Sequence, residues 1–156
     1  MKILVYGAGN IGSLYAAKLK DAGHDVTILA RGARLHEIRE HGILLQDFRS
    51  GQKSTTQIEA VERLAPDDAY DLVWVILPRN SISKILPILE ANRKTPSVMF
   101  FGNNAAGPKE MIKVLGRDRV LLGFPGAAAV PQREYIRYIV LDQREQPTTN
   151  GELDGS

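Results

Sequence analysis

MKILVYGAGNIG, residues 1–12, is the stretch from which the fold of this chain can be predicted. The apolar run at 3–6 is short and partly β-branched, which is typical of a buried strand. It leads into Gly7-Ala8-Gly9-Asn10-Ile11-Gly12, whose glycines have the G-x-G-x-x-G spacing. A helix is predicted next, with one apolar face, and a second strand at 26–30 completes a βαβ unit of about 30 residues. The apolar face consists of Ile11, Leu14, Tyr15, Leu19 and Ala22.

If this turn binds a dinucleotide, each of its three glycines has a role that requires the absence of a side chain. Gly7 permits the tight turn off the strand, Gly9 lets a pyrophosphate approach the backbone because it has no Cβ, and Gly12 lets the helix pack closely on the sheet. The free N–H groups of the first helical turn and the helix dipole favour the negative charge of phosphates. The alternative is a glycine-rich turn that binds nothing, and the complete βαβ context argues against it.

The rest of the chain continues the alternation of strands and helices. Strands are predicted at 71–77, 97–101, 120–124 and 135–141, and helices at 33–40, 82–89 and 110–115, with a kink or an early stop at Pro87. Residues 42–48 and 54–58 predict a hairpin on a sheet edge, 61–64 a short turn, 125–129 a loop and 146–156 a polar stretch. The prediction is one α/β domain at 1–156 of the Rossmann type, with a doubly wound, mostly parallel sheet and helices on both faces.

Composition narrows the class of protein. The chain has 156 residues, of which 44% are hydrophobic and 24% charged, and these values are ordinary for a globular protein. A net charge of +2 without a basic run gives no support for nucleic-acid binding, and no apolar run reaches the ~18 residues of a membrane span. There is no cysteine, and the three histidines lack ligand spacing, so no metal site is predicted. The N-terminus enters a strand directly, so the cytoplasm is the expected compartment.

Arg31 indicates which nicotinamide nucleotide to expect. In a dinucleotide fold the residue at the end of the second strand meets the adenosine ribose, where an acidic residue selects NAD and an arginine suits the 2′-phosphate of NADP. Arg31 has this position, with Arg34 close behind, and a guanidinium can hold a phosphate through two charge-assisted bonds. The alternative is that both arginines are solvated at the entry of the next helix. Position and charge favour NADP.

Two further strand ends are candidate ligand sites, because ligands of open α/β sheets bind beyond the carboxyl ends of the strands. Leu77, Pro78 and Arg79 follow one strand and are expected to border the cofactor. Asn103 and Asn104 follow another and offer amide groups to a ligand, although asparagine also favours turns. The small residues at 125–129 would let a flat ring lie close to the backbone, and they would equally suit a tight turn.

The order of these motifs resembles the N-terminal domain of the ketopantoate reductase (2-dehydropantoate 2-reductase) family. The resemblance rests on the glycine segment at 7–12, the strand end at 30–32 and the GNN loop at 102–104, together with LGFPGA at 122–127 and TTNGELDG at 148–155. It covers nearly the whole chain. It implies an enzyme that reduces a 2-oxo acid, ketopantoate, to pantoate with NADPH, on the route to pantothenate and coenzyme A.

The resemblance also implies residue roles. The glycine segment would hold the pyrophosphate and Arg31 the 2′-phosphate, while Asn103 would lie by the nicotinamide and the substrate. Ala129 matches a position whose backbone borders the nicotinamide. The chain departs from the family at Pro78, where a lysine is often found, which leaves Arg79 as the candidate for that charge. It also has Asn104 where the family usually has glycine.

The family's general-acid lysine and its substrate-holding carboxylate belong to a helical C-terminal domain that residues 1–156 lack. Carbonyl reduction needs a proton donor and a site that excludes water, so no catalytic residue is assigned and this truncated chain is expected to show little or no turnover. Its expected partners are the 2-oxo acid and the absent domain, and the uncovered docking face could also drive formation of a homo-oligomer. Two alternatives stay open: a non-catalytic NADP-binding sensor or interaction module, and a reductase of another 2-oxo acid.

Overall fold

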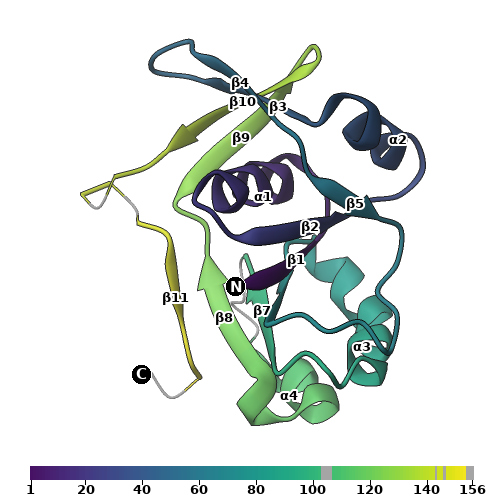
Figure 1. The fold of residues 1–156 in the computed structure, drawn as a ribbon. Coiled ribbons are helices and arrows are strands. Elements are labelled where there is room, and N and C mark those ends of the chain that lie inside the picture. The colour runs from purple at the N-terminus through teal and green to yellow at the C-terminus, as the bar shows by residue number, and fades with distance from the viewer. Residues whose placement is uncertain (103–106, 143, 146, 154–156) are drawn as a thin grey trace.

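The computed structural model describes residues 1–102, 107–142, 144–145 and 147–153. Within these residues the chain forms a seven-stranded sheet, here the main sheet, and a four-stranded sheet, here the second sheet (Figure 1). The main sheet consists, in spatial order, of β11 (Thr149–Gly151), β8 (Val120–Phe124), β7 (Ser97–Phe101), β6 (Leu72–Val75), β1 (Lys2–Tyr6), β2 (Asp25–Leu29) and β5 (Glu59–Val61). The second sheet consists of β4 (Lys53–Thr56), β3 (Ile43–Asp47), β10 (Tyr135–Val140) and β9 (Ala127–Gln132).

The main sheet has the strand order of a dinucleotide-binding fold. Neighbouring strands from β5 to β8 are parallel, and the order β5-β2-β1-β6-β7-β8 is the 3-2-1-4-5-6 order of Rossmann sheets. β11 pairs antiparallel with β8 at the far edge. The predicted fold class is therefore confirmed. The strand order reverses between β1 and β6, so the crevice where such sheets bind ligands lies beyond the carboxyl ends of these two strands.

Helices cover both faces of the main sheet (Figure 1). Alternate residues of β1 explain this, because Ile3 and Val5 join one apolar core whereas Leu4 and Tyr6 join the other. The first core also contains side chains of α1 (Asn10–Asp21) and α2 (Gly32–His41), and the second contains those of α3 (Ile82–Ala91) and α4 (Lys109–Leu115). Two short 3₁₀ turns, η1 (Arg79–Ser81) and η2 (Arg117–Arg119), precede α3 and β8.

α1 is buried more completely than its sequence pattern predicts. The second sheet lies over the outer side of this helix, so that α1 is packed between two sheets (Figure 1). Ala16 and Ala17 lie off the predicted apolar face, yet both are fully buried. Their small side chains allow close approach on both sides, whereas Tyr15 and Leu19 of the predicted face are only partly buried.

The structure also corrects several local predictions. Residues 59–61 pair as β5 ahead of the expected turn, 127–132 form β9 where a loop was expected, and 149–151 form β11 inside the polar stretch. The hairpin is confirmed as β3–β4, but β3 lies inside the second sheet because it pairs with β10. The predicted early stop at Pro87 is wrong, since α3 continues to Ala91 with Pro87 on its exposed side.

Candidate functional site

The turn after β1 requires two of its three glycines for its own shape. Gly7 has φ +126°, which L side chains rarely adopt, and a Cβ there would run into the backbone carbonyl oxygen of Ile76. Gly12 is buried in the first turn of α1, where a Cβ would overlap the carbonyl oxygen of Gly7. The predicted tight turn and close helix packing are therefore present. The nearest atoms to Gly12 belong to the turn itself, and the side chain of Ile76, which follows β6, lies behind it.

Gly9 differs from the other two, because nothing in the described protein requires a glycine there. Its φ is −70°, it is exposed, and a Cβ would meet no atom within 4 Å. Gly9 is the N-cap of α1, which begins with Asn10 and Ile11, and the helix has neither a side-chain cap hydrogen bond nor an acidic residue in its first turn. The first N–H groups of α1 are thus available to an anion that approaches over Gly9.

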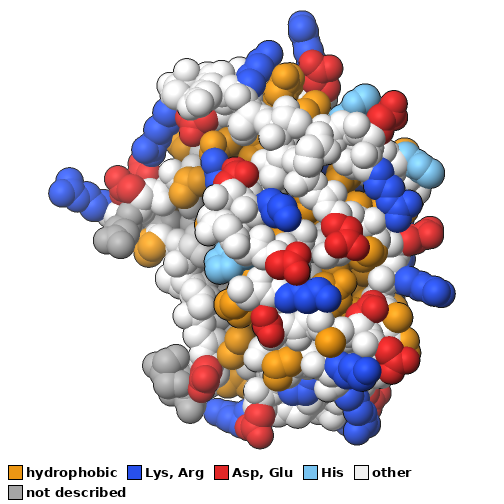
Figure 2. Space-filling model, in the orientation of Figure 1, with side chains coloured by type: hydrophobic (Ala, Val, Ile, Leu, Met, Phe, Trp, Pro, Cys, Tyr) orange, Lys and Arg blue, Asp and Glu red, His pale blue; other side chains and the backbone are white. Residues whose placement is uncertain are grey.

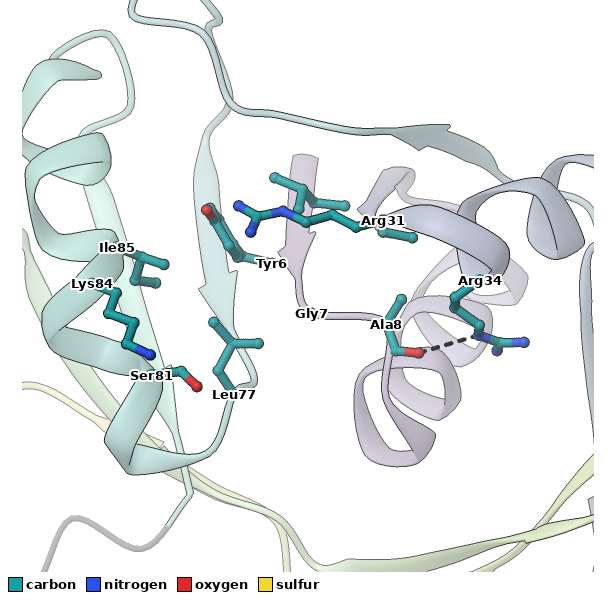
Figure 3. Close-up of a pocket in the computed structure, with 11 residues that line it drawn as sticks. Tyr6, Gly7, Ala8, Arg31, Arg34, Leu77, Ser81, Lys84 and Ile85 are labelled. Atoms are coloured by element: carbon teal, nitrogen blue, oxygen red, sulfur yellow. Dashed lines mark hydrogen bonds between the residues drawn. The ribbon is translucent and has the colours of Figure 1, made fainter.

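A pocket of about 460 Å³ opens beside this turn, at the carboxyl ends of β1, β2 and β6 (Figure 3). This volume lies within the ~300–1,000 Å³ of small-molecule sites. The described residues that line it include three cations but no carboxylate. The lining residues are Tyr6, Gly7, Ala8, Leu29, Ala30, Arg31, Arg34, Leu77, Ser81, Lys84 and Ile85.

Arg31 lies next to Tyr6 at the pocket. Arg31 is the N-cap residue of α2, and its guanidinium lies near the hydroxyl end of Tyr6 (Figure 3). Burial raises the pKa of Tyr6, and the nearby positive charge of Arg31 opposes this rise without cancelling it. The hydroxyl is therefore protonated at neutral pH, and the guanidinium of Arg31 lines the pocket where the sequence predicts a phosphate ligand.

Arg34 lines the same pocket, but its guanidinium is engaged within the protein. Its Nε donates to the carbonyl oxygen of Ala8 at 3.2 Å, and Nη2 donates to Ser13 Oγ at 2.9 Å. Nη1 forms an ion pair with the carboxylate of Glu37 at 2.7 Å. Arg34 thus connects α2 to the glycine turn, and its charge is already paired. The sequence places Arg34 near a phosphate but does not show this bracing contact.

The other predicted residues lie in different places. Leu77 lines the pocket, whereas Pro78 and Arg79 are exposed and are not among the lining residues. Ala129 pairs with Tyr138 in the second sheet, away from this pocket. Asn103 lies outside the described residues.

Lys84 lines the pocket, although the sequence reasoning did not single it out. It projects from α3 into the space beside Leu77 (Figure 3). The available signal was its spacing from Ser81, because residues three apart share one face of a helix.

Two other kinds of site, a metal centre and a membrane-spanning helix, can be judged within the described residues. No group of three or more histidine, aspartate or glutamate side chains among these residues is placed to hold a metal ion. None of the helices in the same residues is long and apolar enough to cross a membrane. Figure 2 shows Lys and Arg interspersed with Asp and Glu over the face in view, so the coloured residues of that face form no continuous basic surface.

Comparison with known proteins identifies the family. The family described as ketopantoate reductase PanE/ApbA matches residues 3–138, which include the glycine turn, Arg31 and Lys84. The chain belongs to this family. The resemblance seen in the sequence is therefore confirmed.

Individual relatives agree with this assignment. A curated 2-dehydropantoate 2-reductase from Pyrococcus horikoshii is 31% identical over 144 residues, which cover 79% of this chain and 47% of that protein. The structure of 2-dehydropantoate 2-reductase from Methylococcus capsulatus matches with a TM-score of 0.77 at 20% identity, over 99% of this chain and 49% of the other. A D-mandelate dehydrogenase solved with NADH and anilino(oxo)acetate matches with a TM-score of 0.72 at 20% identity, over 93% and 50%.

These matches also show how much of each relative this chain covers. The chain spans about half the length of each of these three relatives. At 20% identity, the two solved structures establish the fold of the described residues. The matches therefore establish family membership and fold, while activity, substrate and cofactor have to be argued from the pocket.

Proposed function

We propose that this chain is the NADPH-binding half of a ketopantoate-reductase-like enzyme that reduces 2-dehydropantoate to pantoate, in the biosynthesis of pantothenate and coenzyme A. The observation that carries the proposal is the pocket beside the glycine turn. An uncapped helix N-terminus, open space over Gly9 and the guanidinium of Arg31 surround it. These are the groups that bind a pyrophosphate and a further phosphate.

The choice of NADP over NAD rests on the charges of the pocket. A carboxylate at the end of the second strand would bind the ribose 2′-hydroxyl of NAD, and no carboxylate occurs in the described lining. Arg31 lies at that strand end with its charge unpaired by any acid in the lining. The related D-mandelate dehydrogenase was solved with NADH. The fold itself is therefore compatible with either nucleotide, and the proposal depends on Arg31.

The described residues bind and orient the nucleotide, and they supply no assigned proton donor. Bound NADPH would deliver a hydride to the carbonyl carbon of a 2-oxo acid. The N–H groups of α1 fix the pyrophosphate and Arg31 fixes the adenosine end, which directs the nicotinamide end along the carboxyl edge of the main sheet. We propose that Asn103 faces the nicotinamide and the substrate there. Hydride transfer leaves an alkoxide that must take up a proton. We propose that a residue outside these 156 donates this proton.

Titration of the purified 156-residue chain tests the proposal directly. We expect a saturable calorimetric signal with NADPH and weaker binding of NADH. In an assay with ketopantoate and NADPH, we expect little or no oxidation of the nucleotide. A folded sample, judged by circular dichroism, that bound neither nucleotide would refute the cofactor assignment. Turnover at a rate normal for reductases would refute the assignment of the proton donor to another part of the enzyme.

A further inference from the structure

Lys84 is a cation in the pocket to which no sequence motif assigns a role. It lies near the start of α3, and its side chain extends past Leu77 into the pocket (Figure 3). Among the described residues its ammonium has neither a hydrogen-bond nor an ion-pair partner. Lys84 is exposed, so water solvates the ammonium in place of a protein partner. A ligand that carries negative charge would give it one.

The charges around the pocket leave two cations for such a ligand. Arg34 forms an ion pair with Glu37 and donates hydrogen bonds to Ala8 and Ser13. Its guanidinium is therefore already engaged by protein groups. Arg31 approaches from the start of α2, and Lys84 approaches from α3 on the opposite wall, with Tyr6 and Leu77 between them (Figure 3). No carboxylate in the described lining neutralises either one.

This arrangement matches a phosphate monoester better than it matches a hydroxyl. A phosphate monoester carries about −1.5 to −2 charges at pH 7, close to the two positive charges of Arg31 and Lys84. The planar guanidinium can bind two oxygens side by side, while the compact ammonium can bind a third from another direction. A free 2′-hydroxyl would leave both cations without a counter-charge.

We infer that Lys84 is a second determinant of NADP specificity, which binds the 2′-phosphate from the wall opposite Arg31. The inference rests on the proposed function, because it assumes that the adenosine end of the nucleotide lies in this pocket. It places on α3 a charge that the family resemblance implies for Arg79, and Arg79 is not among the residues that line the pocket.

The test compares Lys84→Ala with a matched loss of charge elsewhere. Lys113, exposed on α4 and outside the pocket lining, provides the control Lys113→Ala. Calorimetric titrations of the full 156-residue chain would give the Kd of NADPH and NADH for the unaltered chain and both variants. We expect Lys84→Ala to weaken NADPH binding by roughly ten- to a hundredfold, the usual range for a charge-assisted hydrogen bond, and to leave NADH within about twofold.

A second ligand localises the effect. Adenosine 2′,5′-bisphosphate lacks the nicotinamide, so Lys84→Ala should weaken it by the same factor as NADPH if the contact is at the adenosine end. Lys113→Ala should change none of these constants, and thermal melts should show that both variants are folded.

The outcomes separate the inference from the proposed function. If the unaltered chain prefers NADPH and Lys84→Ala keeps the same NADPH-to-NADH ratio, the role of Lys84 is refuted while the cofactor assignment stands. Equal weakening of both nucleotides would also refute it, because it would show a contribution that does not depend on the 2′-phosphate. If the unaltered chain binds neither nucleotide, the proposed function fails and this inference fails with it.

Discussion

Substitution of Gly9 and of Gly12 by alanine should affect two different properties, the affinity for the nucleotide at Gly9 and the stability of the fold at Gly12. The two glycines lie three residues apart in the same turn, and their surroundings differ completely. A Cβ at Gly9 meets nothing within 4 Å, whereas a Cβ at Gly12 overlaps the backbone carbonyl of Gly7. Gly9→Ala therefore perturbs only what approaches from outside, and Gly12→Ala perturbs the protein itself.

The expected loss of stability at Gly12 follows from these contacts. Relief of the overlap requires a shift of the turn, which is itself confined because Gly7 faces the carbonyl of Ile76. Overpacking of this kind costs about 2–3 kcal/mol, and the better helix propensity of alanine offsets about 1 kcal/mol of it. The net loss of about 1–2 kcal/mol corresponds to a fall in Tm of roughly 2–8 °C for a chain of this size.

Gly9→Ala should behave in the opposite way. Its φ of −70° suits alanine, and fewer conformations of the unfolded chain then raise stability by up to about 1 kcal/mol. A methyl group placed where a pyrophosphate approaches should instead cost about 1–3 kcal/mol of binding, or roughly five- to a hundredfold in Kd. NADPH and NADH should lose equally, because they share the pyrophosphate.

Thermal melts by circular dichroism and calorimetric titrations of both nucleotides would measure the two effects on the same samples. Gly9→Ala should keep or raise Tm and lose affinity, while Gly12→Ala should lose both. A Gly9→Ala chain that binds NADPH as tightly as the unaltered chain would show that no phosphate lies over this residue. A greater loss of stability for Gly9→Ala than for Gly12→Ala would show that the description of the turn is wrong.

Three other substitutions test the surroundings of the site. Arg34→Met removes the donors that brace the glycine turn, so it should lower stability by about 1–2 kcal/mol and weaken NADPH and NADH alike; a change in their ratio in titrations would contradict this. Asn92→Ala removes the side-chain donor to two backbone carbonyls, bound at 2.8 and 2.7 Å, of which that of Ala65 still accepts from the N–H of Asp68 at 3.2 Å; it should lower the unfolding free energy in urea by about 1–3 kcal/mol while nucleotide binding is kept, and a loss below about 0.5 kcal/mol would contradict it. Tyr15→Phe removes the 2.7 Å hydrogen bond to Thr148, so amide exchange at 149–151 should accelerate while β8 is unchanged; equal protection in both chains would show that this bond does not hold β11.

The fold of the main sheet could be predicted because its signals are local. The run at 3–6, the glycine turn and the helix after it lie within about 30 residues, as a βαβ unit requires. The later parallel strands read as continuous apolar runs, since both of their faces are covered, and Leu72–Val75 is buried throughout. The position of Arg31 at the pocket was predictable for the same reason, because it follows directly from its place at a strand end.

The second sheet was not predictable, because it depends on pairing between distant segments. β3 and β10 are about 90 residues apart in the chain, and their parallel register has no counterpart in either local pattern. β5 and β11 are three residues long, which is too short for an alternating pattern to be read. Arg34 shows the same limit within the site, since the turn and Ser13 to which it donates are more than 20 residues away in the chain. Lys84 does so too, because the pocket that it lines is formed by segments distant in sequence.

The two kinds of ligand contact in this pocket come from separate parts of the fold, and this has a consequence for cofactor choice. Under the proposed function, backbone groups of the glycine turn bind what NADPH and NADH share. Arg31, at the start of α2, and Lys84, on α3, would then face what differs between them. Changes in the turn should therefore alter the affinity for both nucleotides, and changes in the two cations should alter their ratio. A fold built in this way can change nucleotide preference without loss of its binding turn, which is consistent with a relative of the same fold that was solved with NADH.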